Sequence, residues 1–169
     1  MLLLPRWLVS LITFPGVVIH EFAHKKFCDW THVPVRKVRY FRFGDPAGYV
    51  EHDEPDFFYQ TFFISVGPLI INSAVAVLLA YLAVRLHPRF DAGVLMLWVG
   101  FAAGACAFPS DEDMRHIVDK GSANLRNGGS FLYILSYPFF ALIWLANKLR
   151  YVYFDFLYAF VLVMVGLSL

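Results

Sequence analysis

Long apolar runs separated by short polar stretches dominate the pattern along the chain. A helix needs about 20 apolar residues to cross a bilayer. Five segments approach that length: 3–27, 57–84, 94–108, 131–146 and 152–169. The third is short and extends back to Phe90 only by including Asp91. In the first, Pro15 and Gly16 are typical of a kink. The pattern therefore predicts about five membrane-spanning helices.

Two polar stretches interrupt the apolar runs. Residues 33–55 are rich in Val, Tyr, Phe and Arg around the turn sequence FGDPAG. This predicts strands at 35–43 and 47–52, joined as a small hairpin. Residues 109–130 are polar, and Ser110 is placed to cap a short helix. We expect a single domain over residues 1–169, an all-α polytopic membrane protein with a β-hairpin between its first and second helices.

Composition and charge agree with a membrane protein. The chain is 59% hydrophobic and only 16% charged, against about 25% charged residues in soluble domains. A net charge of +1 gives no basic surface of the kind that nucleic-acid binding requires. Cys28 and Cys106 lack a CxxC spacing, and we interpret them as small buried residues.

The distribution of basic residues predicts an orientation in the membrane. One set of loops holds nine of them: Lys25, Lys26, Arg36, Lys37, Arg39, Arg42, Arg115, Lys120 and Arg126. The opposite side holds five: Arg6, Arg85, Arg89, Lys148 and Arg150. Because cytoplasmic loops carry the excess of Lys and Arg, we expect an external N-terminus and a cytoplasmic hairpin, in the plasma membrane of a prokaryote.

The first apolar segment contains the sequence VVIHEFAH, residues 17–24. On a helix, His20 and His24 lie on one face about a turn apart, so that both rings can reach one metal ion. Glu21 is rotated by about 100° and can act as a general base without being a ligand. Lipid penalises ionisable side chains, which makes them functional candidates. The alternative is that His20 and Glu21 lie at a helix end and face lipid headgroups.

A catalytic zinc ion needs a third protein ligand and an open position. In the predicted topology the third apolar segment ends at FPSDED, on the same side of the membrane as the histidines. Asp111 and Asp113 are therefore candidate ligands. The alternative is that Asp113 is an ordinary acidic residue in the first turn of a helix capped by Ser110.

The second apolar segment carries Gly67-Pro68 near its inner end and Asn72 one turn later. Gly67 and Pro68 would loosen the helix and admit another backbone. Asn72 is interpreted either as an interhelical hydrogen-bonding residue or as a group beside the metal that holds a substrate carbonyl.

Together these motifs resemble the site-2 protease family of intramembrane zinc metalloproteases. The resemblance covers about residues 5–118 and includes the strand region. Its motifs are His20-Glu21-x-x-His24, Gly67-Pro68 with Asn72, and Pro109 through Asp113. The family's usual third motif, roughly Asn-x-x-Pro-x-x-Pro-x-Asp-Gly, is not kept. The stretch FPSDED is similar instead to a compact archaeal-type branch with Phe-Pro-Ser-x-x-Asp, which favours Asp113 as the ligand and leaves Asp111 as the alternate.

The resemblance implies a three-helix core and one Zn²⁺ per chain. The implied ligands are His20, His24 and Asp113, with Glu21 and Asn72 as catalytic residues. The implied activity is hydrolysis of peptide bonds in membrane-embedded or juxtamembrane proteins, whose helices must first unwind. An exposed hairpin edge is a candidate to receive the unwound segment as an added strand. The helices over 130–169 lie outside this core and are candidates to contact a second copy or a membrane partner.

Two rival functions remain open at this point. The chain is alternatively a non-proteolytic membrane scaffold or binding protein that retains the fold of a zinc site. Haem binding through two histidines is disfavoured because residues i and i+4 of one helix cannot occupy opposite axial positions on one iron. His52 is interpreted as a solvated loop residue, and the alternative is that it orients a ligand or gates the site.

Overall fold

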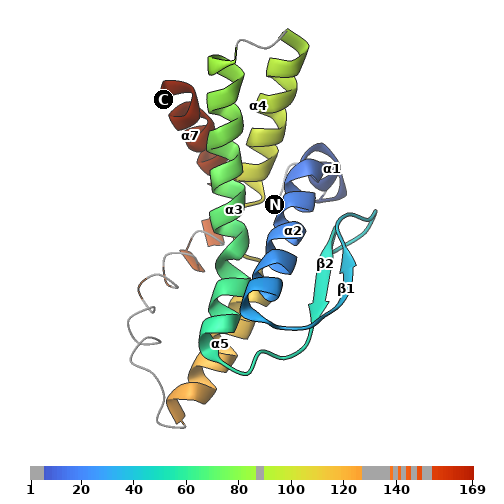
Figure 1. The fold of residues 1–169 in the computed structure, drawn as a ribbon, viewed down its shortest axis with the longest axis vertical. Helices are drawn as coiled ribbons and strands as arrows, with labels where there is room; N and C mark the ends of the chain where they lie inside the picture. The colour runs from blue at the N-terminus through green and yellow to red at the C-terminus, as the bar shows by residue number, and fades with distance from the viewer. Residues whose placement is uncertain are drawn as a thin grey trace.

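A computed structural model describes residues 6–86, 90–126 and 154–169, with isolated positions between 138 and 149. Within this part the protein is mostly helical, as predicted (Figure 1). Six helices are described: α1 (Arg6–Ile12), α2 (Phe14–Thr31), α3 (Phe58–Arg85), α4 (Phe90–Ala105), α5 (Asp111–Arg126) and α7 (Phe154–Ser168). Two strands, β1 (Val35–Arg39) and β2 (Tyr49–His52), lie between α2 and α3.

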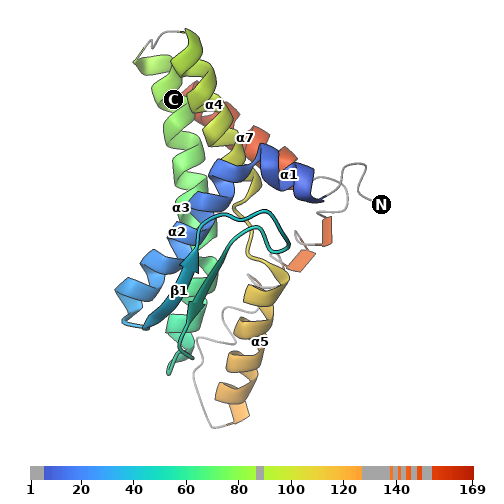
Figure 2. The ribbon, with the colours of Figure 1, turned by 90° about the vertical axis from the view of Figure 1, so that its right-hand side faces the viewer.

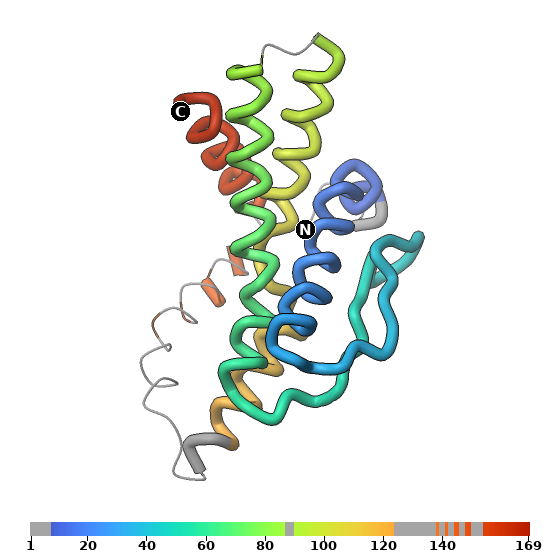
Figure 3. Tube along the Cα trace, viewed as in Figure 1, coloured from blue at the N-terminus to red at the C-terminus, as the bar shows by residue number. Residues whose placement is uncertain are grey.

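Helix α3 is the axis of the molecule, and α2, α4, α5 and α7 all pack on it (Figure 1). Helices α4 and α7 cover one half of its length, while α2 and α5 cover the other. The tube view shows α4 ending near the middle, after which the chain continues into α5 toward the opposite end (Figure 3). The start of α5 is thereby brought close to α2.

The hairpin forms where the sequence predicts it, but its strands are shorter. β1 and β2 pair antiparallel, with Val38 opposite Val50 and an irregularity near the start of β1. The connecting loop occupies 40–48, where the backbone N–H of Arg42 donates to the carbonyl of Ala47 at 2.7 Å. Turn-forming residues in FGDPAG thus end the pairing earlier than expected. Figure 2 shows the hairpin lying against α2 on one side of the molecule.

The first apolar segment forms two helices instead of one kinked helix. The chain breaks at Thr13, where the hydroxyl donates to the carbonyl of Val9 at 2.8 Å, two residues before Pro15. The second of these helices continues to Thr31 rather than ending at Phe27. Across the predicted end Lys25 and Asp29, one turn apart, form an ion pair at 2.8 Å, an i,i+4 pair of the kind that supports a helix.

The remaining predicted segments differ in how closely the structure matches them. α3 agrees with the prediction within a residue at each end. α4 begins at Phe90, includes Asp91, and ends three residues before Phe108. α7 is described from Phe154, and the first two residues of the predicted segment, 152 and 153, lie outside the described residues. The predicted segment 131–146 lies outside the described residues apart from isolated positions.

The packing of α3, α4 and α7 places small residues inside and large apolar residues outside. Ala76, Ala80, Ala102, Ala103 and Ala159 are each at most 1% exposed. Exposed side chains on the same helices are large and apolar: Leu78, Val84, Phe90, Val94, Leu95, Leu157, Phe160, Val161 and Met164. Close backbone approach through small residues is how helices associate in membranes.

Among the described residues, α3 alone has both the length and the apolar composition needed to cross a membrane. α4 and α7 are similarly apolar but contain 16 and 15 residues. At 1.5 Å per residue they fall short of a hydrocarbon core about 30 Å thick.

Gly16 sets the distance between α2 and α4. A Cβ atom at this position would lie 1.9 Å from the carbonyl oxygen of Ala102. We expect Gly16→Ala to destabilise the protein by about 1–3 kcal/mol through overpacking, although alanine favours helices. Thermal unfolding in detergent measures this. Gly100→Ala is the matched control because its Cβ would lie 3.2 Å from the Ala76 oxygen; equal losses in both variants would contradict the prediction.

Candidate metal centre

His20, His24 and Asp113 converge on one point between α2 and the start of α5. Their candidate ligand atoms all lie within 4.8 Å of one another. The Nε2 atoms of the two histidines are 3.1 Å apart. The His24 Nε2 is 3.5 Å from the Asp113 Oδ2. The predicted cluster is therefore present, and it can hold a metal ion.

Backbone carbonyls fix the orientation of both imidazole rings. The Nδ1 of His20 donates to the carbonyl of Cys106 at 2.6 Å, and the Nδ1 of His24 donates to the carbonyl of Ile64 at 2.9 Å. A carbonyl oxygen only accepts, so each Nδ1 must carry the hydrogen. In the neutral rings, the Nε2 lone pairs then face one another. This is the orientation that metal-ligating histidines adopt when an outer hydrogen bond holds the ring.

Both carbonyls are available to the histidines because of how the sequence interrupts or ends the helices around them. In α3 the Ile64 carbonyl would normally accept from the N–H of residue 68, but Pro68 has no N–H. Cys106 directly follows the end of α4, where carbonyls have no further helical donor. Pro68, which the sequence indicated only as a loosened point, thus provides the acceptor that orients His24.

The distances fit a tetrahedral metal ion. Two nitrogen ligands at about 2.0–2.1 Å from zinc lie about 3.3 Å apart in a tetrahedral site, close to the 3.1 Å between the histidines. Two facing lone pairs repel unless a proton or a cation lies between them. The carboxylate that completes the cluster favours a cation, and a His₂-carboxylate set is an established catalytic zinc set.

Asp113 takes part in the cap of α5 and also lies in the cluster, the two positions that the sequence left as alternatives. The Ser110 hydroxyl caps α5 by accepting from the Asp113 N–H at 3.1 Å. In turn the Ser110 N–H donates to the Asp113 Oδ2 at 2.7 Å. Burial raises the pKa of the Asp113 carboxyl, but His24 and further polar contacts hold that pKa below its usual range. Capping therefore positions an ionised carboxylate for the cluster, whereas Asp111 is exposed and outside it.

Glu21 lies beside the cluster without belonging to it. Its side chain is 8% exposed and interacts electrostatically with His24 and Asp113. The hairpin covers it, since a Cβ placed on Gly48 would lie 2.6 Å from the Glu21 Cγ and 3.0 Å from its Oε1. Only a glycine leaves room for the carboxylate at this point. The alternative that Glu21 faces lipid headgroups does not fit this burial.

Asn72 is fully buried and connects helices. Its Nδ2 donates to the carbonyls of Gly16, Ala103 and Cys106 at 3.1–3.2 Å. The Cys106 carbonyl is also the acceptor of His20, so Asn72 supports the ring from behind. The structure therefore contains the interhelical hydrogen bonds that one of the two interpretations of Asn72 predicts. Contact between Asn72 and a substrate stays a prediction. The amide hydrogens of Asn72 already donate to backbone carbonyls of the protein.

Three features of the site have only weak signals in the sequence. The Ile64 and Cys106 carbonyls belong to the backbone, and only Pro68 and the end of an apolar run mark them. Gly48 was visible as turn chemistry, but its contact with Glu21 depends on how the hairpin folds over α2. His52 lies at the margin, where its Nδ1 donates to the carbonyl of Asp53 at 2.7 Å.

No protein-family model, curated protein or solved structure matches the chain. The inference of function therefore depends on the geometry of the site and on the motif resemblance.

The structure predicts different metal affinities for two neighbouring aspartate variants. Asp113→Asn removes a ligand charge from the cluster, and we expect zinc affinity to fall by at least about 100-fold, beyond the loss seen for outer-shell changes. Asp111→Asn removes the same charge from an exposed position of the same turn and should leave affinity unchanged. Zinc stoichiometry and chelator competition measure both. Equal affinities in the two variants would exclude Asp113 as the ligand.

Proposed function

We propose that this protein is an intramembrane zinc metalloendopeptidase of the site-2 protease type. The convergence of His20 Nε2, His24 Nε2 and Asp113 beside a buried Glu21 carries the proposal. A structural zinc site is normally closed by four protein ligands, whereas a catalytic site keeps one position open. Among the described residues the cluster has three such ligands, which favours catalysis.

The residues around the cluster divide the chemistry between them. A zinc ion held by the three ligands supplies Lewis-acid chemistry, polarising a carbonyl and lowering the pKa of water toward neutrality. Glu21 is the candidate general base, taking the proton from the attacking water and passing it to the leaving amine. The Cys106 and Ile64 carbonyls keep the histidine rings oriented, and Asn72 braces the first of these carbonyls.

Membrane location is supported by the packing of α3, α4 and α7. Large apolar side chains on these helices are exposed while alanine and glycine form the contacts between them. A soluble protein rarely exposes so large an apolar surface. His20 contacts Cys106, just past the end of α4, and His24 contacts Ile64 in the second turn of α3, which supports a site near one membrane face. The excess of Lys and Arg assigns that face to the cytoplasm.

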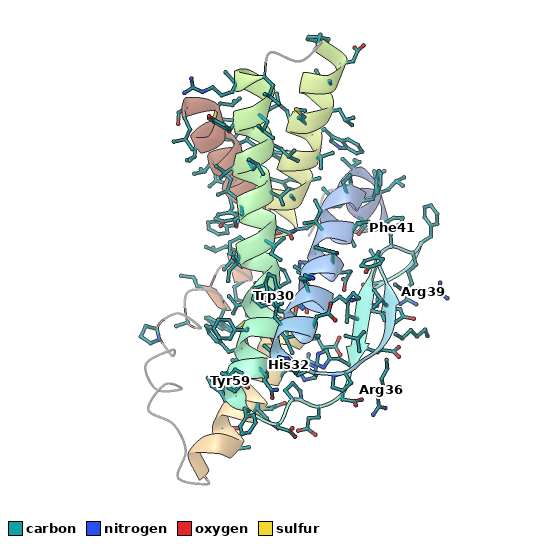
Figure 4. All side chains as sticks on the ribbon, viewed as in Figure 1. Trp30, His32, Arg36, Arg39, Phe41 and Tyr59 are labelled. Carbon is teal, nitrogen blue, oxygen red and sulfur yellow. The ribbon has the colours of Figure 1, made fainter. Side chains whose placement is uncertain are left out.

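The hairpin is the candidate surface for an unwound substrate. It has two strands in the described part of the chain, so each strand has one edge without a partner strand. Arg36 and Arg39 extend from it away from the helices (Figure 4). Its return strand begins at Tyr49, next to Gly48, which contacts Glu21. A segment added beside the hairpin would therefore have its backbone directed toward the general base.

The variant Glu21→Gln distinguishes the proposed peptidase from the alternative of a non-proteolytic scaffold. The variant should still bind one zinc ion per chain, because Glu21 is outside the cluster, while cleavage of single-span membrane substrates should fall by about 10²–10⁴-fold, the usual contribution of general acid–base catalysis. Zinc content and product formation in lipid vesicles are measured together. Equal product from wild type and variant would refute the peptidase. Bound zinc with no cleavage by either protein would favour the scaffold.

Gly48→Ala should shift the Glu21 carboxylate and lower activity without changing the binding of zinc. The added methyl group would displace the Glu21 carboxylate, and misplacement by about 1 Å can cost about 100-fold in rate. Zinc affinity should be unchanged. Gly44→Ala is the control, since its Cβ would meet only Arg42 at 3.8 Å. Full activity in Gly48→Ala would contradict the contact.

A further inference from the structure

A polar cavity of about 740 Å³ opens beside the metal centre. It lies between the β2–α3 connection, the first turns of α3, and one face of α5. Its volume is within the range of ligand-binding pockets. Asp113 is part of its wall, and so is Ile64, whose carbonyl orients His24. The cavity therefore shares Asp113 with the candidate metal centre and adjoins it.

Negative charge predominates in the wall of this cavity. Five carboxylates and a single lysine, Lys120, line it within the described part of the chain. Asp53 pairs with Arg36, and Glu54 pairs with Lys120 at 3.1 Å. Asp56 and Asp119 are exposed, and neither has an ion-pair partner among the described residues. The cavity thus has two carboxylates available to a cationic ligand.

The wall also contains a buried hydroxyl group that lacks a partner. Thr61 is 5% exposed and lines the cavity, yet its Oγ1 makes no hydrogen bond with any described residue. A buried polar atom without a partner costs free energy and calls for an explanation. A peptide backbone in the cavity would provide both a donor and an acceptor for this hydroxyl.

We propose that this cavity binds the basic polar flank of the membrane substrate, in an extended conformation with Lys or Arg side chains on Asp56 and Asp119. The inference rests on the proposed function, since it supplies the substrate class of the same site. Cytoplasmic flanks of single-span proteins are enriched in Lys and Arg, and the cavity is on the side assigned to the cytoplasm. A divalent cation is disfavoured because the described part of the chain forms one metal-binding group, and that group is the metal centre itself.

Binding is tested with the full-length, zinc-loaded Glu21→Gln protein and fluorescent ten-residue peptides that carry Lys, Ser or Glu at the same positions. Tight binding of the Lys peptide alone, weakening with salt, is the expected result. In the double variant Asp56→Asn, Asp119→Asn, we expect its affinity to fall about three- to tenfold, as for exposed ion pairs. Asp29→Asn with Asp91→Asn removes two exposed charges elsewhere and should change nothing. Equal binding of Lys and Glu peptides, or Lys binding that survives in the first double variant, would overturn the proposal.

Thr61→Val distinguishes a built site from a merely acidic surface. The variant keeps the shape of the side chain, so thermal stability should be unchanged or raised, because an unsatisfied hydroxyl is removed. Affinity for the Lys peptide should nevertheless fall by about twofold to tenfold. Unchanged affinity would remove Thr61 from the site and overturn the proposed mode of binding.

Cleavage by the wild-type protein separates this inference from the proposed function. Equal kcat/KM for membrane substrates with basic and neutral flanks would refute the cavity assignment and leave the peptidase standing. Specific binding of the Lys peptide without any cleavage would refute the peptidase and leave the cavity as a basic-peptide site.

Discussion

The structure depends on holding two imidazole lone pairs and a carboxylate against one another in a buried place. Unless a proton or a cation lies between them, these groups repel one another, which is costly where burial limits access to water. A cation at their centre resolves the conflict, but only if the rings cannot rotate away. Rotation is prevented by the Ile64 and Cys106 carbonyls. Both are available because a proline and a helix end removed their usual partners. The sequence therefore encodes the site as much through missing backbone donors as through its ligands.

Much of the site was predictable because its signals are local. Helical periodicity alone predicts that His20 and His24 share a face. Ser110, as a capping residue, predicts the start of the helix that contains Asp113. Choosing Asp113 over Asp111 on residue chemistry was not possible, since both are acidic residues of one turn; the decision depends on the rotation of α5 against α3. The apolar runs predicted that the helices exist, but they did not predict the residues at which each helix begins and ends. Helix α2 continues beyond its apolar run, through Lys25 and Asp29, to Thr31. The strands β1 and β2 are shorter than predicted because the connection between them is longer.

The hairpin and the polar helix α5 approach the metal centre from different directions and perform different tasks. The hairpin places Gly48 against Glu21, so this carboxylate, the proposed general base, is confined by the hairpin backbone. Helix α5 buries Met114 and Ile117 against Val66 of α3, which fixes its rotation and leaves Asp113 toward the histidines and Asp119 toward the cavity. A substrate that reaches Glu21 between these two elements would have its backbone near the hairpin and its polar flank near α5.

Packing through small residues explains how so many polar atoms can be satisfied in such an apolar molecule. Gly16 lets α2 approach α4 closely enough for Asn72 to reach carbonyls on both helices. A larger residue there would separate His20 from Cys106 and free the ring. Two buried atoms of α3, Thr61 Oγ1 and Asn72 Oδ1, still have no partner in the described part of the chain. They lie on either side of Pro68 along α3. Thr61 lines the cavity proposed for the substrate flank, and a ligand that completes the hydrogen bonds of its buried hydroxyl would explain why that group lacks a partner.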